Sequence, residues 1–243
     1  MKLGLGLSIN NRIDAAWTPE KLGDQLKLWL RNDTSILESD GSAAEDGEDI
    51  TRWSDFSGNA NHMVAENNFF DYDSATGGIE STDSTNSRLY LATDGSKNIT
   101  FEDGFALYMR VSLSTISSGG NDLFVYDSDA TGEDFFRAQS TTELRAKINN
   151  STKVGFTQAT QSVDTFYNFG FERDGSNVVT AYRDGSSLTK ITSGGYETGA
   201  ISGDFVLDAI GGLFDGIIKE VVWADRGLTA AERTKLNTYL DKL

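Results

Sequence analysis

Apolar and polar side chains alternate with a period of two in several segments of this chain. The clearest segment runs from Phe105 to Leu113, and residues 144–148, 167–171 and 205–209 repeat the pattern. Successive side chains of a β-strand point to opposite faces, so each segment predicts a strand with one buried and one water-facing side. The buried side should carry Leu107, Met109, Val111, Phe169, Phe171 and Trp223. The water-facing side should carry Tyr108, Arg110, Ser112, Arg145 and Lys147.

Turn and cap signals divide the remaining chain. Arg-Asp-Gly-Ser occurs at 173–176 and at 183–186, which predicts two tight turns and a meander of three strands. Thr229 and Glu232 have the spacing of a capping box, which predicts a C-terminal helix. Leu22, Leu26, Trp29 and Leu30 would suit a helix, but alternation over 26–30 favours a strand that begins after a break at Gly23.

These elements predict an all-β fold, an antiparallel sandwich of two sheets with a short C-terminal helix. With 243 residues, 25 Gly and a single Pro, we expect one compact domain over residues 17–243. Residues 1–16 are predicted to form an arm outside the sandwich. The polar stretches 38–49 and 71–86 are predicted to be surface loops.

Composition excludes several classes of function. The formal net charge of −16 should repel phosphate backbones and anionic lipids, so neither a nucleic acid nor a membrane is expected as a partner. The chain has no Cys, which excludes disulfides and thiolate chemistry, and its single His62 argues against a catalytic triad. The N-terminus lacks the pattern of a secretion signal, and we expect a soluble protein.

Two groups of oxygen-bearing side chains have the residue types that calcium prefers. Asp55, Asn59 and Asn61 form the first group, and Asp127 and Asp129 open the second. For each group, an ordinary Asx-rich turn is the alternative to a calcium site, and it is the favoured interpretation. Calcium is therefore a candidate cofactor at these five positions, and the sequence indicates no other.

Three aromatic residues lie in a polar segment, where an apolar patch suggests contact with a partner. They are Phe69, Phe70 and Tyr72, the candidate ligand-binding residues. Trp53 and Trp223 lie in patterned segments and are assigned to the core.

Hydrolysis of glycans would require two suitably spaced carboxylates. The retaining glucanase motif Glu-x-Asp-x-x-Glu fails at Glu38, where its last position is Ala43, and at Glu172, where it is Asn177. We therefore expect a protein that is not an enzyme.

Three segments together resemble a known family. They are Leu26-Lys27-Leu28-Trp29-Leu30 with its preceding helical turn, the stretch from Trp53 to His62, and residues 214–223 followed by the capping box. In this order they are similar to the laminin G-like branch of the concanavalin A-like lectin/glucanase superfamily. The resemblance implies a jelly-roll sandwich, and members of the superfamily bind glycans, join cell-surface proteins or decorate phage particles.

The opening residues 1–8 look like the start of tailed-phage structural proteins. The resemblance implies a virion component, made in the host cytoplasm, that decorates the capsid or forms a tail appendage. Its partners would be other virion proteins, its own copies or cell-surface glycans. Leu3, Leu5, Leu7 and Ile9 are candidates for docking on a neighbouring subunit, or for an ordinary first strand of the same sandwich. The alternative function is a lectin-like glycan-binding module of a cell-surface or secreted protein.

Overall fold

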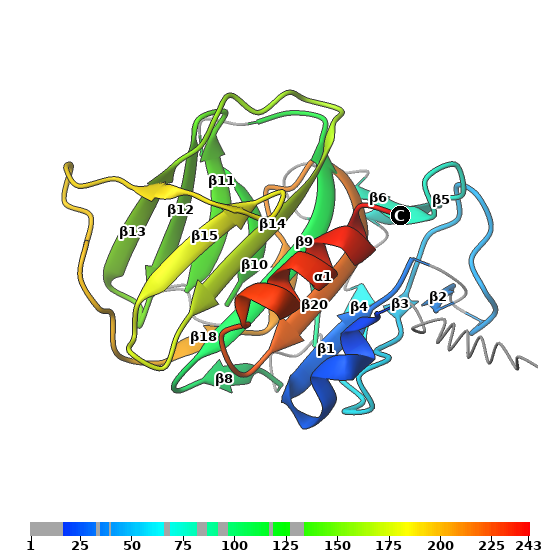
Figure 1. Ribbon diagram of the computed structural model, residues 1–243. Coiled ribbons are helices and arrows are strands. Elements are labelled where there is room, and N and C mark those ends of the chain that lie inside the picture. The colour runs from blue at the N-terminus through cyan, green and yellow to red at the C-terminus, as the bar shows by residue number, and fades with distance from the viewer. Residues whose placement is uncertain are drawn as a thin grey trace, which may run out of the picture.

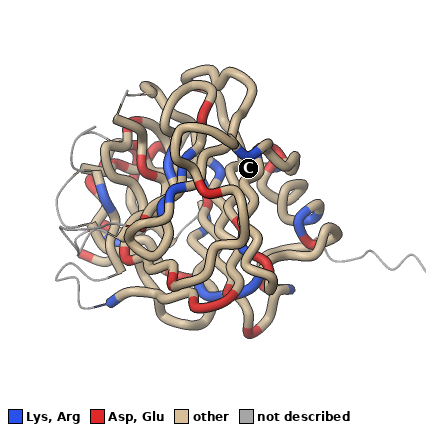
Figure 2. Tube along the Cα trace, turned by 90° about the vertical axis from the view of Figure 1, so that its left-hand side faces the viewer, with Lys and Arg blue, Asp and Glu red and all other residues tan. Residues whose placement is uncertain are grey.

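Two antiparallel sheets face each other across an aromatic core (Figure 1). This computed structural model describes residues 17–32, 35–38, 40–65, 69–81, 87–91, 97–116, 119–126 and 134–243. We call the sheet that carries the C-terminal helix α1 (Ala230–Leu240) the front sheet and the other the back sheet. Figure 2 turns the view by 90° and marks the Lys and Arg residues in blue and the Asp and Glu residues in red. The predicted antiparallel sandwich with a short C-terminal helix is confirmed.

The front sheet has eight strands among the described residues. Its order is β16 (Ser186–Ser187), β15 (Val179–Arg183), β14 (Phe166–Arg173), β9 (Phe105–Leu113), β20 (Gly216–Ala224), β6 (Gly78–Ser81) and β5 (Phe70–Asp73). The eighth strand, β1 (Leu26–Leu30), also pairs with β20 and follows the short 3₁₀ helix η1 (Pro19–Gln25), which Gly23 interrupts with a φ of +60°. The predicted strand over 26–30 and the meander of β14, β15 and β16 are thus confirmed.

The back sheet has ten strands among the described residues. Its order is β17 (Thr189–Lys190), β13 (Thr152–Thr157), β12 (Glu143–Ile148), β11 (Phe135–Ser140), β10 (Asn121–Val125), β19 (Ala209–Gly211), β7 (Arg88–Tyr90), β4 (Met63–Ala65), β3 (Arg52–Trp53) and β2 (Ile36–Leu37). A separate pair joins β18 (Phe205–Leu207) to β8 (Ile99–Phe101).

The core lies between the sheets and is dominated by aromatic rings. Phe171 of β14 is at its centre, with its ring centroid 4.8 Å from that of Phe136, 5.2 Å from Phe105 and 5.7 Å from Phe205. The six side chains predicted to be buried are all inaccessible to solvent: Leu107, Met109, Val111, Phe169, Phe171 and Trp223. Trp53 is also fully buried. The period-two alternation therefore identified the inner face correctly.

The outer face of the front sheet is covered, which the alternation did not predict. Leu236 and Leu240 of α1 pack on Tyr108, Trp29 and Val222 in a second apolar cluster. Tyr108 is consequently 1% exposed and Ser112 is also buried, so placing them on a water-facing side was wrong. The alternation along a strand does not show whether its outer face is covered by water or by a helix that makes both apolar and polar contacts.

Two further expectations about segments are corrected. Residues 71–86 were expected to form a loop, but β5 and β6 pair as a hairpin, with Tyr72 opposite Ile79. Residues 205–209 were expected to form one strand, but the segment divides at buried Asp208 between β18 and β19, which belong to different sheets. No helix among the described residues is long and apolar enough to cross a membrane.

Candidate functional site

The Asp55 turn anchors β1 through hydrogen bonds. One Asp55 oxygen accepts the backbone N–H groups of Trp29 and Ser57 at 2.9 and 2.8 Å, and the other accepts the Ser57 hydroxyl and the Asn61 N–H at 2.7 and 2.9 Å. Asn59 and Asn61 donate to the carbonyls of Leu26 and Lys27. Calcium would have to displace these donors, so the contacts support the Asx-turn alternative, and calcium here stays a prediction.

His62 belongs to the same turn. Its Nδ1 accepts the backbone N–H of Asp55 at 3.0 Å, and burial together with nearby Arg52 lowers its pKa. A nitrogen that accepts this hydrogen bond must be unprotonated. His62 therefore acts as a neutral acceptor that stabilises the turn.

The predicted aromatic patch is only partly at the surface. Phe70 is fully buried and its ring lies 6.4 Å from that of Phe214, so assigning it to ligand contact was wrong. Its side chain points inward because it begins β5 rather than lying in a loop. Phe69 and Tyr72 are half-buried, and their role in binding stays a prediction. Asp127, Asp129, Leu3, Leu5, Leu7 and Ile9 lie outside the described residues.

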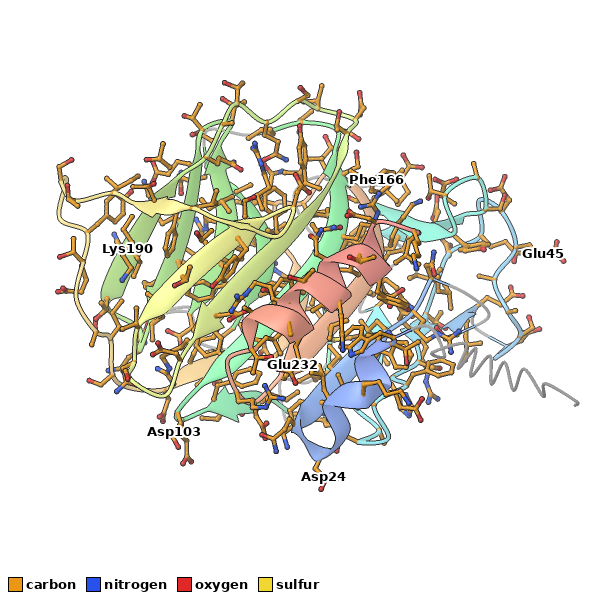
Figure 3. The ribbon with its side chains drawn as sticks, viewed as in Figure 1. Asp24, Glu45, Asp103, Phe166, Lys190 and Glu232 are labelled. Atoms are coloured by element: carbon orange, nitrogen blue, oxygen red, sulfur yellow. The ribbon has the colours of Figure 1, made fainter. Side chains whose placement is uncertain are left out.

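A cleft of about 470 Å³ opens on the outer side of the front sheet, beside the start of α1. Its walls come from β14, β15, the hairpin between them, the link from β20 to α1 and the turn before β9. Figure 3 labels Asp103 at that turn and Glu232 at the start of α1. Gly104 allows the link to approach closely, because a Cβ there would lie 3.0 Å from the Arg173 carbonyl and 3.3 Å from the Arg226 Cα.

An ion pair beneath the cleft joins α1 to the front sheet. Arg233 donates to both oxygens of Glu172, at 2.9 and 2.8 Å, and the hydroxyl of Tyr108 donates to the same carboxylate at 2.5 Å. This pairing raises the pKa of Arg233. The guanidinium also lies 4.3 Å from the centre of the Tyr182 ring. Glu172 is 5% exposed and fully engaged, so it serves as an anchor for the helix.

A second ion pair fixes the start of α1. Thr229 and Glu232 form the predicted capping box, and Arg226 donates to both Glu232 oxygens at 3.0 and 2.7 Å. The hydrogen bonds from Arg226 and Thr229 lower the pKa of Glu232 to about 2. A carboxylate whose pKa falls on folding stabilises the protein when the pH is above the pKa of the unfolded state. This contribution is lost as the pH falls toward the pKa of the folded state.

We therefore expect Glu232→Gln to lower the free energy of unfolding by about 1 kcal/mol at pH 7, because glutamine keeps the size but loses the charge. The difference from wild type should shrink as pH falls from 4.5 toward 2. Urea unfolding at pH 7, 4 and 3 measures it, with exposed Glu102→Gln as the matched control. A difference that is independent of pH would show that charge is not the cause.

Because Arg233 and Arg226 are paired with Glu172 and Glu232, the cleft exposes mainly hydrogen-bond acceptors. Asp103 and Asp174 are exposed, and Asp225 is half-buried with one oxygen 2.7 Å from the Lys27 ammonium. Thr180 and Tyr182 add hydroxyl groups to the lining, and Val178, 42% exposed, adds an apolar surface. Carboxylates and hydroxyls around a small apolar surface are suited to a ligand with many hydroxyl groups.

Sequence reasoning noticed Glu172 only as part of a failed glucanase motif, and Asp174 also as a turn residue. It missed the cleft because the lining comes from segments as distant as Asp103 and Arg233. The capping box was the one usable signal, since it located the helix whose first turn borders the cleft.

No protein-family model and no curated protein matches this sequence. Solved structures do match it. The sialidase of Trypanosoma rangeli in complex with 2,3-difluoro-KDN aligns over 89% of this chain and 33% of its own, with a TM-score of 0.57 and 14% identity. The binding domain of Paraclostridial Mosquitocidal Protein 1 has the same TM-score and identity, over 91% of this chain and 53% of its own.

A third structure is matched over nearly its whole length. It is domain 4 of AbnA, a GH43 extracellular arabinanase from Geobacillus stearothermophilus, in complex with arabinotriose. It aligns over 88% of this chain and 98% of its own, with a TM-score of 0.51 and 13% identity. The chain spans about a third of the sialidase chain and about half of the mosquitocidal binding-domain structure. At these identities the likeness establishes the fold: the chain is a β-sandwich that resembles parts of a sialidase, of an arabinanase and of a mosquitocidal protein.

Proposed function

We propose that this chain is a non-catalytic glycan-binding module whose cleft beside α1 holds a neutral sugar. The cleft itself carries the proposal, because its volume of about 470 Å³ is in the range of small-molecule sites, which is roughly 300–1,000 Å³. Two of the similar structures are complexes with a sugar or a sugar analogue. This supports glycan binding here by analogy of fold, and the residues of the cleft must supply the specific argument.

The charges of the cleft favour a neutral ligand. Arg233 is paired with Glu172, and Arg226 is paired with Glu232, so neither guanidinium needs an anion from outside. Asp103 and Asp174 remain exposed at the rim and would repel an anionic sugar. Their oxygens can accept hydrogen bonds from sugar hydroxyl groups, and Val178 offers an apolar contact for the C–H face of a sugar ring.

The absence of catalysis is part of the proposal. Glu172 is held by Arg233 and Tyr108, and Asp174 accepts the N–H groups of Ser176 and Val178 at 2.9 Å each to form the hairpin turn. Carboxylates with such structural partners are poor candidates for transferring protons. The virion role expected from the first residues stays a prediction, since residues 1–16 lie outside the described part of the chain.

Val178→Arg tests the cleft, because the new side chain would occupy it while the exposed position tolerates the change. A glycan array should identify a neutral oligosaccharide, and calorimetry should show at least tenfold weaker binding by the variant. Val163→Arg is the matched control, since Val163 is 47% exposed and is not part of the cleft lining.

Three results would refute the proposal: no neutral oligosaccharide binds, Val178→Arg binds as tightly as wild type, or Val163→Arg weakens binding equally. Release of reducing ends from the bound glycan by wild type would refute the non-catalytic part alone.

A further inference from the structure

The outer face of the back sheet concentrates positive charge on a protein whose net charge is −16. Along β11, β12 and β13, Phe136, Ala146 and Val154 point into the core, so their neighbours in each strand point outward. We call the outward cations of this sheet the basic face: Arg52, Arg88, Arg137, Arg145, Lys147 and Lys153. Among the described residues, the carboxylates that interact with these cations are Asp122, Asp134 and Glu143.

The strand register brings like charges directly opposite each other. Lys147 of β12 lies opposite Lys153 of β13, and Arg145 of β12 lies opposite Arg137 of β11. Directly opposite residues of antiparallel strands have Cβ atoms only about 4.5–5.5 Å apart, and like charges at this spacing destabilise a sheet. Two such pairs in adjacent rows are a cost to folding that an anionic partner would offset.

Existing contacts neutralise one of the two rows. Arg137 lies 2.7 Å from Asp122, and Arg145 lies 2.9 Å from Glu143. In the other row, Lys147 and Lys153 form no ion pair with any described residue, and Lys153 is exposed. Asp134 attracts Lys147 weakly, but its oxygens accept the N–H groups of Asn150 and Val206. The Lys147–Lys153 row therefore offers two charges for binding.

Aromatic rings lie beside cations of both rows. Phe135 lies opposite Lys147 in the same row, with the Arg137 guanidinium 3.6 Å and the Lys147 ammonium 5.5 Å from its ring centre. The Tyr196 ring covers Gly155 beside Lys153, and its hydroxyl donates to Glu143. Cations beside the Phe135 and Tyr196 rings form a surface that suits a sugar ring bearing a negative charge.

We propose that the basic face binds an anionic polysaccharide, with carboxylate-bearing sugars contacting Lys147 and Lys153. This surface is on the opposite side of the sandwich from the cleft and does not depend on it. A polysaccharide suits the face better than nucleic acid, because the dense phosphate charge of a duplex would be repelled by the acidic remainder of the molecule. Binding should weaken with salt, since the exposed charges are screened.

Oligogalacturonate and its fully methyl-esterified form are suitable probes, because they share a backbone and differ in charge. We expect the full chain to bind the acid form at 50 mM NaCl at least tenfold more tightly than the ester, with most of the difference lost at 500 mM. Lys147→Gln/Lys153→Gln should reduce binding of the acid form at least tenfold. The double variant should not melt below wild type, because it removes the repulsion between the two lysines.

The matched control is Lys21→Gln/Lys235→Gln, which removes the same charge from two exposed lysines elsewhere and should bind like wild type. Val178→Arg should also retain binding of the acid form, which separates this surface from the cleft. Three binding results would overturn the proposal: equal binding of the acid form and the ester, an equal loss of binding in the control variant, or tighter binding of a DNA duplex than of the acid form. A fourth is self-association of the wild type, measured by sedimentation, that is absent in the double lysine variant.

Discussion

Phe171→Ala should lower the free energy of unfolding by about 3–5 kcal/mol. The side chain is inaccessible to solvent, and its ring contacts those of Phe105, Phe136, Phe156 and Phe205, which come from both sheets and from the β18–β8 pair. Truncation would remove the apolar group and leave a cavity that neighbouring strands cannot close without losing their register. Chemical denaturation monitored by Trp fluorescence measures the loss.

Phe56→Ala is the control for this prediction, because the same atoms are removed at a position that is 44% exposed. It should cost about 1 kcal/mol or less. Phe171→Leu should fall between the two, since leucine refills part of the space. A loss below about 1 kcal/mol for Phe171→Ala would contradict the position of this ring at the centre of the core.

Arg173→Met should cost a similar amount, about 3–5 kcal/mol, although it replaces a charge by an apolar chain of similar length. Arg173 is fully buried, and its guanidinium donates to the carbonyls of Phe101, Asp103 and Gly203. Burial lowers its pKa, while nearby Asp103 and Asp204 act in the opposite direction. Methionine would leave three carbonyl groups without these donors at the end of the sandwich.

Arg145→Met is the matched control, because Arg145 is half-exposed and water can replace it at Glu143. It should change the free energy of unfolding by less than about 1 kcal/mol. Arg173→Lys should also destabilise, since one ammonium cannot reproduce the planar arrangement of guanidinium donors. If Arg173→Met were as stable as Arg145→Met, the three hydrogen bonds would have no net structural role.

Arg173 also shows the limit of reading strands from alternation. The pattern that identified Phe169 and Phe171 as inward-facing places Arg173 on the same face, yet the Arg-Asp-Gly-Ser signal assigned it to a turn. The turn prediction was correct for Asp174, whose carboxylate holds the hairpin. Arg173 is the last residue of β14, and its partners are far away in the sequence.

The sequence by itself determined the local elements and the inner face of the sandwich. Period-two alternation specified β9, β12 and β14, turn residues specified the β14–β15–β16 meander, and the capping box specified α1, because backbone geometry depends on neighbouring residues. Only the tertiary structure decided what covers Tyr108 and that Phe70 is buried. It also decided which acidic residues line the cleft and which cations lie opposite each other on the back sheet. These features depend on strand order and register, which join residues through contacts that no local pattern encodes.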